Sequence, residues 1–154
     1  MAQRAKPHGH FLAGEAGELA GVSGNTIGQW ARWGYIRPSQ SDGDPHVYSV
    51  EDVAEAAIVR ALLERGVRHR TVRRAIMHLG DYGEWPLSAA PLATTPDGRL
   101  VLLRENGDVY ALSPRGWQLM TEPPELEEVH LRLRRSSDAA AQRARAAADG
   151  RRGS

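Results

Sequence analysis

The chain has 154 residues, with 20 Lys and Arg against 19 Asp and Glu and no cysteine, which fits one ordinary domain or a small domain with an added element and tail. Without cysteine it forms no disulfide, thiolate zinc site or iron–sulfur cluster, and it has no cysteine nucleophile. The formal net charge of +1 creates no overall basic field, so any binding of nucleic acid has to come from local clusters of cations.

Residues 1–11 are polar, contain Pro and Gly, and predict a flexible arm. No apolar signal core follows this arm, and apolar runs such as residues 100–103 are far shorter than the roughly 20 residues that a membrane span needs. We therefore expect a cytoplasmic protein with no membrane partner.

Two short helices are predicted next. Residues 14–20 suit the first helix, and Gly21 suits a tight turn because glycine readily adopts positive φ. Ser23 is a good N-cap for a second helix, from Gly24 to about Trp33. One face of this helix is apolar and carries Ile27, Trp30 and Ala31. Its other side carries hydrogen-bonding side chains, namely Asn25, Thr26, Gln29 and Arg32.

A β-hairpin is predicted over residues 35–48, with a turn at 41–45 that is rich in Asp, Gly and Pro. Ser49 and Asp52 have the spacing of a capping box, which begins a longer helix that Gly66 ends. A fourth helix is predicted from about Arg70 to Leu79. Arginine is concentrated around its start, at Arg60, Arg65, Arg68, Arg70, Arg73 and Arg74.

The second half of the chain has one strong local pattern. Two apolar segments flank Asn106-Gly107, a pair typical of a type I′ turn, so residues 99–122 predict a β-hairpin element with a third short strand near 117–120. Residues 81–98, rich in Pro, Gly and Ala, are predicted to be a linker. Residues 123–154 predict a charged helix that fades into a disordered tail.

The order of helix, turn, helix, hairpin and two further helices is that of a winged helix-turn-helix. Residues 12–80 resemble the DNA-binding domain of the MerR family of bacterial transcription regulators. The matching positions are 17–23, Thr26, Ile27, Trp30, 34–36, Pro38, Tyr48, Ser49, 51–53, Gly66 and Val67. The expected fold is thus mainly α with small β: a MerR-like winged helix-turn-helix, a small β-hairpin element, and a C-terminal charged helix or tail.

The sequence departs from the family pattern at three places. The family often has arginine at the position of Gly28, and its wing usually has arginine where His46 stands. Members also dimerise through a long antiparallel helix after the DNA-binding domain, whereas residues 81–86 interrupt the chain at that point.

The resemblance implies a sequence-specific regulator of transcription that binds double-stranded DNA as a homodimer and is associated with the nucleoid. Its second helix would enter the major groove, while the wing and the arginine cluster contact the phosphate backbone. The residues expected to contact DNA are Ser23, Asn25, Thr26, Gln29, Arg32, Arg37, His46, Tyr48, Arg68, Arg70, Arg73 and Arg74.

Two alternatives stay open. In an antitoxin-type autorepressor, residues 99–149 would bind a toxin through apolar side chains at Val109, Leu112, Trp117, Leu119 and Leu126. An excisionase-like accessory protein of recombination or DNA packaging would use the same winged domain. No catalytic motif is present, so we expect no enzyme, no cofactor and no metal, and the pair His8 and His10 lacks further ligands.

Overall fold

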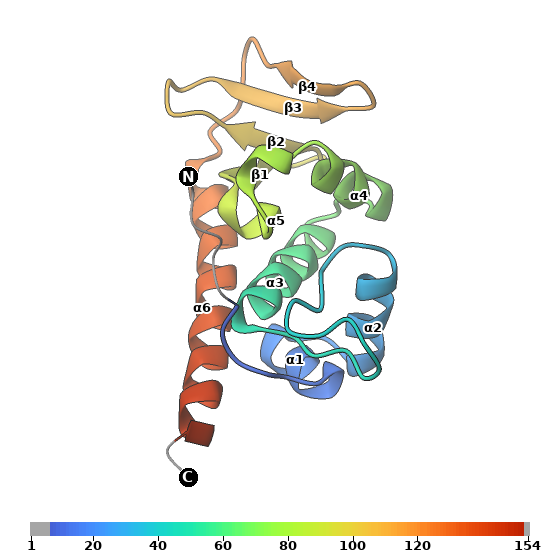
Figure 1. Cartoon of the computed structure of the whole chain (residues 1–154). Coiled ribbons are helices and arrows are strands. Elements are labelled where there is room, and N and C mark those ends of the chain that lie inside the picture. The colour runs from blue at the N-terminus through green and yellow to red at the C-terminus, as the bar shows by residue number, and fades with distance from the viewer. Residues whose placement is uncertain (1–6, 153–154) are drawn as a thin grey trace.

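A computed structural model describes residues 7–152, with side chains up to residue 150. The helical elements and strands in chain order are α1 (Ala13–Ala20), α2 (Gly24–Arg32), α3 (Val50–Glu64), α4 (His69–Met77), the 3-10 turn η1 (Gly80–Tyr82), α5 (Pro86–Ala89), β1 (Leu92–Thr94), β2 (Leu100–Leu103), β3 (Val109–Ser113), β4 (Gly116–Leu119) and α6 (Glu127–Arg152). The predicted class, mainly α with a small β element and a C-terminal helix, is confirmed. Figure 1 shows the sheet at one end, the helix-turn-helix at the other, and α6 along one side.

Helix α3 is the centre of the N-terminal region. It begins at the predicted capping box, in which the Ser49 hydroxyl accepts from the Asp52 amide and the Asp52 carboxylate accepts from the Ser49 amide. Nearly every residue of its first two and a half turns is buried, because α1, α5 and α6 pack around it. The helix-turn-helix is thus built on a helix covered on several sides.

The arm predicted over residues 1–11 is ordered from Pro7 onward, contrary to the prediction. Residues 1–6 lie outside the described part of the chain. Phe11 is 1% exposed and exchanges two backbone hydrogen bonds with Tyr48. The Gln40 side-chain amide also donates to the carbonyls of Pro7 and Gly9. These long-range contacts, which local composition does not encode, hold the arm against the base of the wing.

The wing is a loop with little strand structure, whereas a full hairpin was predicted over residues 35–48. Its pairing is reduced to the bridge between Ser41 and Val47. The residues between the two bridge partners prevent a longer ladder, since Pro lacks the N–H donor and Gly and Asp disfavour strands. These residues include Asp42, Gly43, Asp44 and Pro45.

The four strands form one antiparallel sheet in the order β1-β2-β3-β4. The sequence predicted the β2–β3 hairpin and the third strand near residues 117–120, but the prediction of a type I′ turn is wrong. A type I′ turn needs positive φ at both central residues, and among the described residues only glycines have it. The loop is longer than a two-residue turn, because the Arg104 amide donates to the Asp108 carbonyl. Within this loop Gly107 is the residue with positive φ, at 90°.

Both faces of the sheet are covered by this chain. Leu92, Leu100 and Leu102 pack into the main core, and Val109 packs with Leu126 in a second cluster on the other face. Of the apolar side chains considered above for toxin binding, Val109, Leu112 and Leu126 are buried and Trp117 is half-buried. Only Leu119, on edge strand β4, is clearly exposed, at 55%.

The predicted linker is a packed part of the fold. It contains η1, α5 and β1, and Leu87, Leu92 and Ala93 are each at most 2% exposed. Composition alone indicated a loop here because Pro, Gly and Ala interrupt the apolar pattern. Burial against α3 and pairing with β2 order the segment nonetheless.

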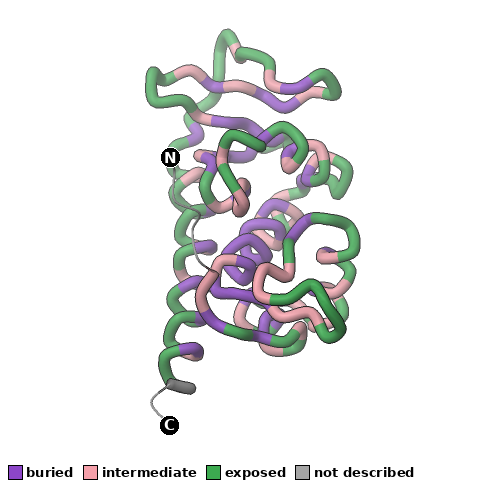
Figure 2. Tube along the Cα trace, in the orientation of Figure 1, coloured by how far each residue is buried: buried purple, intermediate pink, exposed green. Residues whose placement is uncertain are grey.

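Helix α6 continues to Arg152, whereas residues 123–154 were predicted to form a helix that fades into a disordered tail. Figure 2 shows buried positions recurring along its side nearest the rest of the molecule, and these include Leu133, Ala140 and Ala144. Small side chains let α6 lie close to α3 and α1, so packing stabilises a helix whose own sequence is only marginal. No helix within residues 7–152 combines the length and apolar character of a membrane span.

Candidate nucleic-acid interface

Helix α2 is fixed to α1 by a close backbone approach. A methyl group at Gly17 would lie 2.6 Å from the Val22 carbonyl oxygen, so only glycine permits this turn. Ser23 then caps α2, since its hydroxyl accepts from the Thr26 amide at 3.0 Å and lies 2.9 Å from the Thr26 hydroxyl. The Ser23 and Thr26 side chains are therefore engaged with each other at the start of α2.

The two sides of α2 differ as the sequence predicted. Ile27 and Trp30 are 0% and 4% exposed and anchor the helix in the core. Asn25, Gln29 and Arg32 are exposed on its outer side, and they have no hydrogen-bond or ion-pair partner among the residues described. Figure 1 places α2 on the side of the molecule away from α6, so the C-terminal half does not cover this face.

The glycine at position 28 is compensated in space by Arg32. A methyl group built at Gly28 would lie 3.7 Å from a guanidinium nitrogen of Arg32, one turn later in α2. The Arg32 side chain therefore extends back over Gly28. A cation is thus present close to the position at which the family often has arginine.

The base of the wing packs inward. Tyr48 is 1% exposed and its buried hydroxyl has no hydrogen-bond partner among the described residues, so it lies in the core and is not placed to reach DNA. Burial, reinforced by the nearby Asp52 carboxylate, raises the pKa of the Tyr48 phenol. His46 stands edge-on to Tyr48, with a ring-centroid distance of 6.3 Å, and its Nδ1 is buried.

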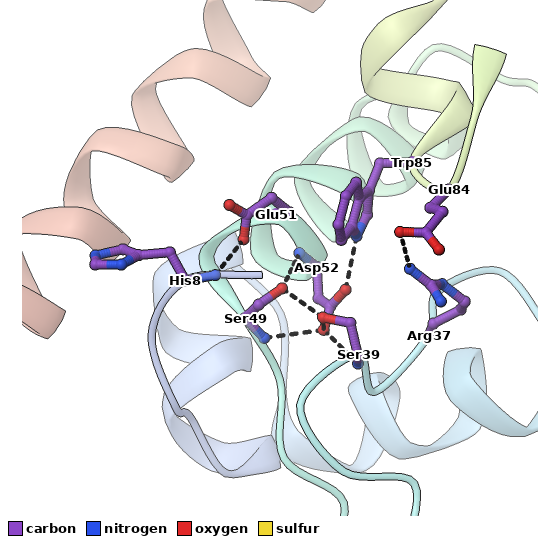
Figure 3. Close-up of polar contacts among 8 residues, drawn as sticks. All are labelled: His8, Arg37, Ser39, Ser49, Glu51, Asp52, Glu84 and Trp85. Atoms are coloured by element: carbon purple, nitrogen blue, oxygen red, sulfur yellow. Dashed lines mark hydrogen bonds and ion pairs between the residues drawn. The ribbon is translucent and has the colours of Figure 1, made fainter. Parts of the chain in front are cut away.

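Arg37 is exposed, but it is engaged within the molecule. Its guanidinium lies 3.4 Å from the Glu84 carboxylate and 5.3 Å from the centre of the Trp85 ring, as drawn in Figure 3. A surface ion pair of this kind is weak. Arg37 therefore joins the wing to the segment before α5, and it would have to leave Glu84 to bind a phosphate.

A buried carboxylate holds the start of the wing. Asp52, 1% exposed, accepts from the Ser39 amide at 2.8 Å, the Ser39 hydroxyl at 2.7 Å and the Trp85 indole N–H at 2.9 Å. Figure 3 shows Ser39 of the wing, Ser49 at the N-cap of α3 and Trp85 at the start of α5 converging on Asp52. Sequence reasoning identified only the capping role of Asp52, since nothing local pairs it with Ser39 or Trp85.

The next turn of α3 carries a second buried carboxylate. Glu55 is 3% exposed and accepts from the amides of Leu87 at 3.1 Å and Ser88 at 2.5 Å, which begin α5. Burial raises the pKa of Glu55 to about 7, because the two amides offset only part of the loss of solvation. No sequence signal marked this residue, which lies in an otherwise apolar stretch.

The start of α4 lies beside the end of α2. The Trp33 and His69 rings meet edge to face at 5.7 Å, and the Tyr35 hydroxyl donates to the His69 carbonyl at 3.1 Å. Arg73 lies over the Tyr35 ring at 5.9 Å. Burial raises the pKa of the Tyr35 phenol, an effect that the Arg73 charge opposes. This aromatic contact sets the position of α4 relative to α2.

The arginines of α4 face outward. Arg68, Arg70 and Arg73 are exposed and Arg74 is half-buried, while Val72 and Ala75 anchor the helix. None of the four arginines has an ion-pair partner in the described part of the chain. Two of them flank the positive end of the helix dipole, a position where cations are unfavourable unless an anion is present.

The expected residues thus separate into two groups. The outer side chains of α2 and the α4 arginines are exposed or half-buried, while Tyr48 is buried and Arg37 has partners within the chain. In residues 7–150, no three His, Asp or Glu side chains come together in a way that could hold a metal ion.

Comparison with known proteins adds one finding. Residues 12–79 match the family model described as MerR HTH family regulatory protein, so this part of the chain is a MerR-type helix-turn-helix domain. The search of curated proteins and the search of solved structures each found no match. The region after residue 79 is outside the family match.

Proposed function

From the MerR-type domain at residues 12–79, we propose that the protein is a transcription regulator that reads double-stranded DNA through α2. The observation that carries this proposal is the exposed row of Asn25, Gln29 and Arg32 on a helix whose other side is locked into the core. A major groove admits one α-helix, and amide and guanidinium side chains read its base edges.

Phosphate contacts would come from the start of α4, aided by the wing. Arg68, Arg70 and Arg73 are exposed beside α2, and the aromatic contact of Trp33 with His69 sets their position. Together with the amides of His69 and Arg70, which have no hydrogen-bond acceptor among the described residues, they offer a site for a phosphate group. His46 and Arg37 would add wing contacts after local rearrangement.

We further propose that the regulator acts as a homodimer in the cytoplasm. One recognition helix offers few base contacts, so high specificity needs two half-sites about 10 bp apart. Helix α6 is packed against its own α3 and would not supply the dimer helix that is typical of the family. Sedimentation of the protein with and without its selected DNA gives the stoichiometry, and one protomer per selected site would contradict the dimer.

Selection from a random duplex pool tests whether DNA is bound and what is read. An inverted repeat is expected. Recovery of no sequence would refute a sequence-specific regulator, whereas a single attachment-site-like sequence would favour the excisionase-type alternative. An antitoxin role has less support, because most of the apolar side chains that suggested it are not exposed.

Base reading and phosphate contact can be separated with two variants. Gln29→Ala should cost roughly 1–3 kcal/mol of binding and relax the preference at one position of the selected site. The matched control is Gln142→Ala, an exposed glutamine on α6, which should change nothing. Equal loss by Gln29→Ala on all sequences would show that α2 touches only the backbone.

Arg70→Ala should instead weaken binding to all sequences and lower the slope of log K against log salt by about one unit. Arg115→Ala, which removes an exposed arginine of the turn between β3 and β4, is the control and should leave the slope unchanged. An unaltered slope for Arg70→Ala would remove this residue from the phosphate contacts.

A further inference from the structure

A cleft of about 540 Å³ lies between the start of α3, the segment around α5, and α6. This volume is within the range of small-molecule sites, which are mostly apolar with a few polar groups. Two aromatic side chains, Tyr82 and Trp85, line it together with small apolar ones. Flat apolar walls of this kind suit a planar ring.

The cleft also carries charges of both signs. Its carboxylates are Glu51, Glu84 and Asp138, and its guanidinium groups are Arg134 and Arg145. Three of these five groups are already engaged: Glu51 accepts from the His8 amide, Glu84 pairs with Arg37, and Arg134 donates to the Ser88 carbonyl.

The remaining two charges are available to a ligand. Asp138 and Arg145 lie two turns apart on the flank of α6 that lines the cleft. Neither has a hydrogen-bond or ion-pair partner among residues 7–150. One free anion and one free cation beside an aromatic wall are complementary to a ligand that carries the opposite pair of charges on an aromatic body.

We propose that this cleft binds a small aromatic zwitterion. The ring would pack on Trp85 and Tyr82, its ammonium group would face Asp138, and its carboxylate would face Arg145. Charge-assisted hydrogen bonds of this kind are stronger than neutral ones, so both charged groups of the ligand contribute to its affinity.

The cleft is connected to the wing. The Trp85 ring lines it, and the indole N–H of Trp85 donates to Asp52, which also holds the amide and hydroxyl of Ser39. A ligand on Trp85 therefore lies one side chain away from the group that orients the wing. This coupling to DNA binding rests on the proposed function, whereas binding of the ligand does not.

The test uses the full chain and three probes that share an indole ring: L-tryptophan, tryptamine and indole-3-propionate. Calorimetric titration should give saturable binding of L-tryptophan, with a dissociation constant of about 1 mM or lower. Each of the other two probes, which lacks one charge, should bind about tenfold more weakly. Failure of L-tryptophan to saturate, or equal binding of all three, would overturn the proposal.

Variants locate the site. Ala89→Phe fills the cleft from an exposed position and should abolish binding, whereas Ala146→Phe, at an exposed position of α6 outside the cleft, should not. Asp138→Asn should remove the advantage of L-tryptophan over indole-3-propionate, and Arg145→Gln its advantage over tryptamine. Unchanged binding by Ala89→Phe would place the ligand elsewhere and refute the assignment.

Coupling has a separate readout. Saturating L-tryptophan should change the affinity for the selected DNA about fivefold or more, the lower range of allosteric coupling. An unchanged DNA affinity, with ligand bound, would refute the coupling alone. A protein that binds no DNA with or without ligand would instead refute the proposed function.

Discussion

At the scale of single residues, two buried carboxylates of α3 connect the DNA-binding region to the segment that follows it. Asp52 joins the wing to Trp85, and Glu55 holds the first amides of α5. Burying a carboxylate is costly unless donors satisfy it. Both residues therefore act as fixed acceptors whose loss would loosen the contacts between distant parts of the chain.

Trp85→Phe should destabilise the protein by about 1–3 kcal/mol, because it removes a donor from the buried Asp52 carboxylate. Urea unfolding followed by circular dichroism measures the change. Trp33→Phe is the control, since Trp33 is 43% exposed and has no hydrogen bond among the described residues. Equal losses in the two variants would show that ring size, not the indole N–H, is what matters.

Glu55 predicts a particular pH dependence of stability. Its folded pKa of about 7 is above the ordinary value, so between pH 5 and 7 the folded state binds more protons than the unfolded state. Glu55 therefore makes its full contribution to the free energy of unfolding below about pH 4.5. This contribution is lost as pH rises through 7, by at most about 1.4 kcal/mol per pH unit.

Glu55→Gln should remove this component. The unfolding free energy of the variant should fall less between pH 5 and 7 than that of the parent protein, in urea titrations at each pH. Parallel curves for the two proteins would mean that Glu55 does not titrate in this range, and that its two amide donors keep it charged.

At the scale of elements, the turn between α1 and α2 depends on one glycine. Gly17→Ala should destabilise the protein by about 1–3 kcal/mol, because its methyl group would meet the Val22 carbonyl at 2.6 Å. Gly14→Ala, in the same helix, is the matched control: a methyl group there meets nothing within 4 Å and should be neutral or slightly stabilising. Thermal unfolding compares them, and similar melting temperatures would contradict the close approach.

Elements with local signals could be predicted, and elements held by distant contacts could not. Ser23, Ser49 and Gly34 mark helix ends by their own chemistry, so α2 and α3 follow from the sequence. Strand β1 has only three residues and is ordered by pairing with β2. The Asn106-Gly107 pair located the hairpin correctly but not its turn type, because the strands pair through Leu103 and Val109 and leave a longer loop.

In the candidate interface, too, the residues set by a local pattern could be predicted and those set by distant contacts could not. Asn25, Gln29 and the α4 arginines lie outside as the helical pattern predicted. For Tyr48 and Arg37 the pattern could not distinguish a side chain that reaches outward from one held inside. The partners that engage Arg37, namely Glu84 and Trp85, are more than 45 residues away along the chain, and only the folded arrangement brings them together.

At the scale of the whole molecule, α6 contacts three separate parts of the fold, namely the sheet, α3 and α1. The His130 ring bonds to the Leu92 carbonyl of β1, Ser137 donates to the Ala54 carbonyl of α3, and Arg143 donates to the Leu19 carbonyl of α1. One helix thus contacts the sheet, the central helix and the helix-turn-helix. We therefore expect the chain to unfold as one cooperative unit.

Ala144→Leu tests this expectation. Ala144 is fully buried where α6 packs on the helices, and the three heavy atoms that leucine adds are too many for a close-packed site. Overpacking of this kind costs about 1–3 kcal/mol. Native-state hydrogen exchange should report that loss equally at amides of α3 and of β2, because both open only on global unfolding. Ala146→Leu, at an exposed position of the same helix, should leave both unchanged. Loss of protection in α6 alone, with α3 and β2 unaffected, would mean that the helix-turn-helix and the sheet are stable without it.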